Sequence, residues 1–146
     1  MLDLLPQALT AAYGSLQAPN YAFVTRALRK RPYRDLVAAL EKVMAVEDIT
    51  DSNYDVSFEY VLGDSAYLLQ LSMVGHFAAL FPLGTSRRTG AALVRADSAD
   101  AETVLCLLKQ HGMYLVDEPT LSLPTTVLDT ESGQTLSVYQ ALFTFS

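Results

Sequence analysis

The sequence predicts a single α+β domain spanning residues 1–146, in which N-terminal helices precede an antiparallel β-meander and a C-terminal helix packs on the sheet. Three observations predict this class. Apolar residues recur at helical spacing through the first 45 positions, then alternate as in strands, and return to a helical period between residues 97 and 112. The chain of 146 residues is long enough to bury one ordinary hydrophobic core.

Three helices are expected ahead of the sheet. The first ends near Gly14, and the second runs from a cap at Asn20 to about Lys30. The third begins with Pro32, whose missing N–H is harmless in the first turn of a helix. Its buried stripe is formed by Leu36, Val37, Leu40, Val43 and Met44.

Three strands should follow. Residues 54–62 alternate so that Asp55 and Glu59 share the face opposite the aromatic side chains. Residues 65–86 carry no formal charge and have the length of a membrane helix, but polar residues, Gly75 and Pro82 interrupt them. We interpret this stretch as two buried strands, residues 66–73 and 76–83, joined near Gly75, and expect no contact with a membrane.

The remaining elements are shorter. Residues 91–96 are a candidate fourth strand, and residues 100–112 form a helix capped by Asp97 or Ser98. Residues 113–116 read as a short strand and residues 117–134 mostly as loop. Residues 136–146 fit either a helix or a strand, because their apolar spacing favours the first and their residue types the second.

No residue pattern predicts catalysis, a metal site or a cofactor. Cys106 lies among leucines and is expected to be a packed apolar side chain. The two histidines, His76 and His111, match no ligand spacing, and the polar loop 84–90 fits no phosphate-binding motif. We therefore expect a protein that is not an enzyme. A single cysteine and the absence of a signal-peptide pattern predict a cytoplasmic location.

Residues 26–34 hold five of the ten Lys and Arg residues in the chain. Nucleic-acid binding requires a broadly basic surface, yet the net charge is −6, and without residues 26–35 it is −10. We interpret this run as a solvated helix end that pairs with acidic residues of the same chain, and expect no nucleic-acid partner.

The acidic residues are more informative. Seven carboxylates fall between Glu41 and Asp64, and five of them are expected to form one negative surface for a protein partner. A surface of this kind accelerates association with a basic partner and disfavours wrong ones. Ordinary solubility charge explains the same residues equally well. The five candidate partner-binding residues are Glu47, Asp48, Asp51, Asp55 and Glu59.

The segment "LLKQHGMYLVDEPTLSLP" and the later "GQTLSVYQALFTFS" resemble the ends of small bacterial immunity proteins of contact-dependent or Rhs-type toxin systems. The resemblance implies an acidic protein that neutralises a basic toxin, commonly a nuclease, by covering its active site or a nearby surface. The alternative is similarity to type III secretion chaperones, which bind a secreted effector as homodimers. The sequence leaves the toxin and the oligomeric state open.

Overall fold

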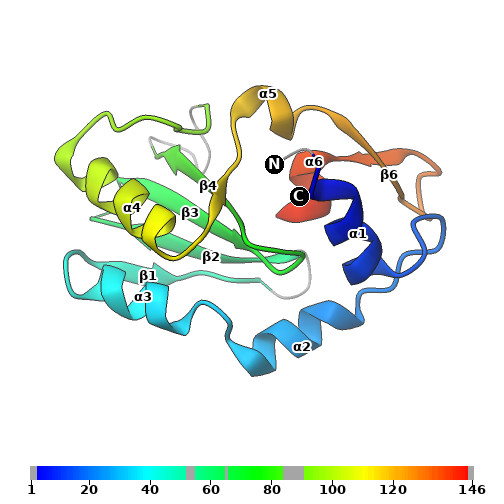
Figure 1. The fold of residues 1–146 in the computed structure, drawn as a ribbon, viewed down its shortest axis with the longest axis horizontal. Helices are drawn as coiled ribbons and strands as arrows, with labels where there is room; N and C mark the ends of the chain where they lie inside the picture. Colours follow the sequence, from blue (N-terminus) through cyan, green and yellow to red (C-terminus); the bar gives the residue numbers. More distant parts are fainter. Residues whose placement is uncertain (1–2, 52–54, 65, 84–90, 145–146) are drawn as a thin grey trace.

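The computed structural model describes residues 3–51, 55–64, 66–83 and 91–144, and shows the expected α+β class. A five-stranded sheet lies between two layers, and a smaller two-stranded sheet lies beside the C-terminal helix (Figure 1). The helices are α1 (Leu5–Tyr13), α2 (Ala22–Lys30), α3 (Arg34–Glu41), α4 (Ala99–Gln110), α5 (Glu118–Leu121) and α6 (Val138–Leu142). The strands are β1 (Val46–Asp48), β2 (Ser57–Leu62), β3 (Tyr67–Ser72), β4 (Phe77–Pro82), β5 (Tyr114–Leu115), β6 (Pro124–Leu128) and β7 (Thr135–Ser137).

The large sheet has the order β1-β2-β3-β4-β5. Its first four strands are antiparallel neighbours. Strands β2 to β4 are the predicted meander, and the uncharged stretch forms β3 and β4. Strand β1 was not predicted. The short strand β5 returns parallel to β4 after α4 crosses one face. In the part of the chain that the structure describes, no helix combines the length and apolar character that crossing a membrane requires.

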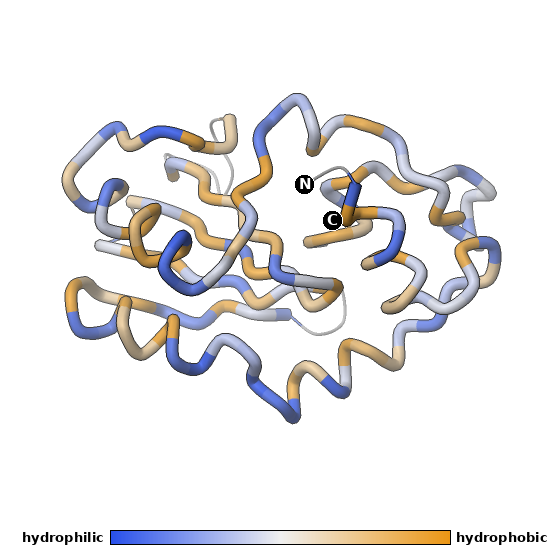
Figure 2. Tube along the Cα trace, viewed as in Figure 1, coloured by the Kyte–Doolittle hydropathy of each residue, from blue (hydrophilic) through white to orange (hydrophobic). Residues whose placement is uncertain are grey.

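Helices α3 and α4 cover one face of the sheet. Phe58, Tyr60 and Leu62 of β2 alternate onto this face and pack beneath Leu36 of α3 and Leu108 of α4. Ser98 caps α4, because its hydroxyl accepts a hydrogen bond of 3.1 Å from the Ala101 N–H. In Figure 2, apolar positions run through the central strands and alternate with hydrophilic ones along the covering helices.

Residues from both ends of the chain cover the other face. The apolar cluster there includes Leu9 of α1, Phe23 of α2, Leu136 of β7 and Leu142 of α6. The hydroxyl of Tyr13 donates a hydrogen bond of 2.6 Å to the carbonyl of Ala141, and this bond joins α1 to α6. Burial explains why the pKa of Tyr13 lies far above its ordinary value.

Two element predictions need correction, and a third segment was left open. Residues 91–96 form no strand, although the Leu93 N–H donates a 2.7 Å hydrogen bond to the carbonyl of Leu80. Residues 117–134, expected as loop, contain α5 and β6. The C-terminal segment, which fitted either a helix or a strand, contains the end of a strand followed by a helix. Strand β7 ends at Ser137, and the same residue caps α6 through a capping box with Gln140.

Candidate functional site

A pocket of about 330 Å³ lies between α3 and the edge strand β1. Its walls combine an aromatic floor with two arginines and two carboxylates. The lining residues are Arg31, Tyr33, Arg34, Val37, Ala38, Glu41, Val46, Asp48, Phe58 and Tyr60.

Two regular patterns bring these side chains together. Along α3, residues 34, 37, 38 and 41 are spaced by three or four positions, so they form one stripe beside the buried stripe of Leu36 and Leu40. In the sheet, Val46 and Asp48 alternate onto the same face, and Asp48 pairs in register with Tyr60. The pocket is therefore the space between one helix stripe and one face of the sheet edge.

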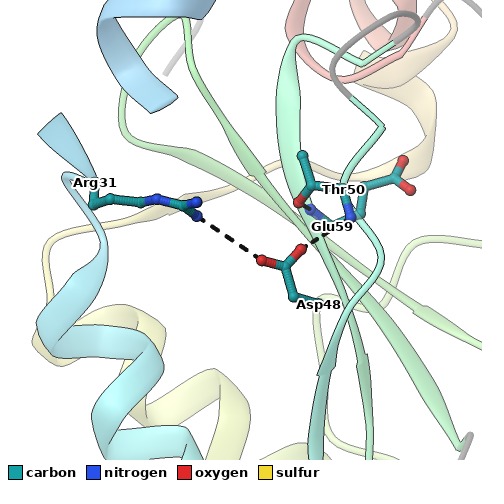
Figure 3. Close-up of polar contacts among 4 residues, drawn as sticks. All are labelled: Arg31, Asp48, Thr50 and Glu59. Carbon is teal, nitrogen blue, oxygen red and sulfur yellow. Dashed lines mark hydrogen bonds and ion pairs between the residues drawn. The ribbon is translucent and has the colours of Figure 1, made fainter. Parts of the chain in front are cut away.

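Arg31 places a guanidinium at this site. It ends α2 in a left-handed backbone conformation with φ of 50°, which is uncommon for a residue other than glycine. Its Nη1 lies 3.9 Å from Asp48 Oδ2 (Figure 3). Its guanidinium carbon lies 5.8 Å from the centre of the Phe58 ring. This ion pair confirms that the basic run pairs with the acidic segment.

The carboxylates act on Tyr60, which forms part of the floor. Partial burial, reinforced by the charge of Asp48, raises the pKa of Tyr60 to about 12. Arg31 opposes that shift, while Glu41 adds to it. The two carboxylates therefore act on this hydroxyl in the same direction, and the guanidinium acts against them.

Tyr33 fixes the helical wall to the sheet. Its buried hydroxyl lies 2.5 Å from the carbonyl oxygen of Ser72 and 2.8 Å from that of Gly75, at the β3–β4 connection. Burial also raises the pKa of Tyr33 well above its ordinary value. The junction of α2 and α3, which carries Arg31 and Arg34, is thus anchored to the central strands.

The five residues predicted to form an acidic surface do not lie together on it. Glu47 and Asp48 are exposed on β1, and Asp51 is half-buried after that strand. Asp55 is only 4% exposed and Glu59 only 1%, so the expectation that these two belong to the surface is wrong. Asp55 also lies before β2 rather than in it, where it forms an isolated bridge with Thr144.

The C-terminal layer is the reason for the burial of Glu59. Glu59 does lie opposite the aromatic face, as alternation predicts, but α6 covers that side of the sheet. Its Oε1 accepts a hydrogen bond of 2.8 Å from Gln70 Nε2, and the same nitrogen lies 3.0 Å from the hydroxyl of Tyr139 in α6. The exposed carboxylates near the pocket are therefore Glu41, Glu47 and Asp48, hereafter the acidic edge.

Other candidate residues lie elsewhere. Cys106 is exposed on α4, which corrects the expectation of a packed side chain. His76 lies in the exposed connection between β3 and β4 rather than inside a strand, and its ring packs edge-on to Tyr33. Residues 84–90 lie outside the described residues. Among those described, no group of three or more side chains is arranged to hold a metal ion.

The pocket itself was not predicted. The helical spacing of Arg34, Val37 and Glu41 is visible in the sequence, but that pattern alone does not reveal that β1 lies opposite this stripe. Comparisons with protein-family models, with curated proteins and with solved structures found no match for this chain.

Proposed function

We propose that this chain is an immunity protein that binds a basic protein toxin through the acidic edge and thereby neutralises it. The observation that carries the proposal is the position of Glu47 and Asp48, exposed on the outermost strand of the sheet and next to a pocket. Charged groups at such a position are accessible to a large partner without any rearrangement of the core.

The charge of the molecule supports this choice of partner. The net charge of −6 attracts a basic protein. Within the acidic edge, Glu41 and Asp48 both line the pocket, and Glu47 lies on the other face of β1. The same carboxylates disfavour unspecific pairing at the end of the sheet, because charged residues on a short edge strand discourage strand addition. Recognition would then depend on the side chains of the cognate toxin.

Native mass spectrometry of the protein co-expressed with the product of the neighbouring gene tests the proposal. A one-to-one complex with a basic protein, together with protection of cells that express that protein, is the expected result. A homodimer that carries one long and partly unfolded partner would instead support a secretion chaperone. A basic neighbour that is toxic but forms no complex would contradict the immunity function.

A further inference from the structure

We infer that the pocket between α3 and β1 receives an arginine side chain of the protein partner, which takes over the contacts with Asp48 and Phe58 that Arg31 makes in the free protein. This inference rests on the proposed function, because it takes the partner to be a basic protein. It adds the chemical identity of the anchoring group and the position at which it binds.

The internal contacts of Arg31 show which chemistry the pocket accommodates. A guanidinium is stabilised over an aromatic ring and beside a carboxylate, and the pocket offers both at distances of 5.8 Å and 3.9 Å. A volume of about 330 Å³ is near the lower end of the roughly 300–1,000 Å³ typical of small-molecule pockets. One long side chain fits such a space better than an extended segment.

Arg31 makes only weak contacts with Asp48 and Phe58, so a partner can displace it from them. Its ion pair with Asp48 is long, and the two side chains are 51% and 48% exposed, so screening by water leaves little stabilisation. The Arg31 side chain is long and half exposed, and it can turn into solvent while its backbone remains at the end of α2. An incoming arginine would then contact Asp48 and Phe58 without unfolding any element.

Once Arg31 turns away, the described lining has one cation, Arg34, against Glu41 and Asp48, so it favours a cation over an anion. Arg31 and Arg34 balance Glu41 and Asp48 in formal charge, but one of the arginines already contacts Asp48. Near the aromatic floor the two carboxylates act on Tyr60 in the same direction, and Arg31 acts against them. When Arg31 turns away, the carboxylates remain and the local field becomes more negative. An anion would have to approach these same carboxylates.

A titration of the isotopically labelled protein with the peptide acetyl-Gly-Arg-Gly-amide, followed by NMR, tests the inference. We expect saturable shifts of the amide signals of Val37, Asp48 and Tyr60, and weaker binding of the lysine peptide, which lacks a planar group to stack on Phe58. The variant Asp48→Asn should weaken binding of the arginine peptide roughly two- to fivefold. Glu131→Gln, a change of an exposed carboxylate in the β6–β7 connection, should leave the affinity for the arginine peptide unaltered.

Removal of the Arg31 guanidinium gives the sharpest comparison. Arg31→Gln should strengthen binding of the arginine peptide by roughly two- to fivefold, because the peptide no longer competes with Arg31. Loss of binding in this variant would overturn the inference, as would tighter binding of acetyl-Gly-Glu-Gly-amide or the absence of saturable shifts with the arginine peptide. The spectra also report whether each variant is folded.

The outcomes separate this inference from the proposed function. If the protein forms a complex with a basic toxin and protects cells, but the arginine peptide does not bind, only the pocket inference fails. If the peptide binds but no basic partner is found, the immunity function fails, and the assignment of the occupant to such a partner fails with it.

Discussion

The amide Nε2 of Gln70 donates a hydrogen bond of 2.8 Å to Glu59 Oε1, which joins β2 to β3 inside the molecule. Glu59 and Gln70 are paired in register, and each is 1% exposed. The side chain of Glu59 therefore belongs to the core, and its substitution should affect folding rather than partner contact.

We expect Glu59→Lys to lower the free energy of unfolding by about 3–5 kcal/mol, because it places a positive charge at a buried position beside Gln70, whose neutral amide cannot pair with it as a carboxylate would. Glu59→Gln keeps the size and an acceptor oxygen, and should lower it by about 1–2 kcal/mol. Urea denaturation measures both. Glu47→Lys on exposed β1 is the matched control, with an expected change within about 0.5 kcal/mol. Equal effects of the two lysine variants would contradict the buried position of Glu59.

The acidic edge should determine the rate of association with a basic partner. Asp48→Lys is expected to reduce the association rate constant roughly two- to fivefold at low salt, with a smaller reduction at high salt. Glu131→Lys makes the same change of charge in the connection between β6 and β7. Stopped-flow mixing of each variant with the partner measures both rates, and equal rates for the two would show that the acidic edge does not direct binding.

The backbone at Arg31 should favour glycine over other replacements. Its φ of 50° is adopted freely by glycine, whereas a residue with a Cβ is destabilised there by about 1 kcal/mol. Arg31→Gly and Arg31→Ala lose the same side-chain contacts, so we expect the glycine variant to be more stable by about that amount. Thermal or urea unfolding measures both variants. Equal stability of the alanine and glycine variants would contradict backbone strain at position 31.

Tyr60 gives a prediction for alkaline pH. Its pKa is raised from 10.0 to about 12, so the folded protein keeps the neutral phenol where the unfolded chain ionises. The unfolded state therefore binds fewer protons in this range, and stability should fall as the pH rises from 10 to 12. Asp48→Asn removes a charge that raises this pKa and should shift it downward. The difference in tyrosinate absorbance between each protein and its Tyr60→Phe counterpart measures the pKa, and an unchanged value would exclude the effect of Asp48.

Cys106 should behave as a surface thiol. It is exposed on α4, with Gln110 Nε2 lying 3.6 Å from its sulfur. We expect Cys106→Ala to change stability by at most about 0.5 kcal/mol. A thiol reagent should modify the native protein without unfolding it. Modification only in denaturant would place the thiol in the interior.

The sequence predicts the elements whose periodicity is local. Strand β2 follows from the alternation in residues 54–62, and β3 and β4 follow from the uncharged apolar stretch that is interrupted near Gly75. The cap of α4 follows from Ser98 and the apolar spacing after it. None of these predictions depends on contacts with distant parts of the chain. Residues 91–96 satisfy the same local rule for a strand, yet no described strand pairs with them in the sheet.

The candidate site could not be predicted in the same way, because it depends on which layers of the fold pack against each other. Alternation correctly puts Glu59 and Phe58 on opposite faces, but only the tertiary position of α6 shows that this helix buries Glu59. The position of β1 beside α3, which creates the pocket, likewise results from tertiary packing. Exposure was therefore predicted wrongly for Asp55, Glu59 and Cys106.

The bond between Tyr13 and Ala141 has a consequence for synthesis on the ribosome. It spans 128 positions, and the layer that it closes draws on α1 and on α6. One face of β3 and β4 is therefore fully covered only after α6 has left the ribosome. During translation that face would be available to chaperones, and a chain halted before residue 136 would present it permanently.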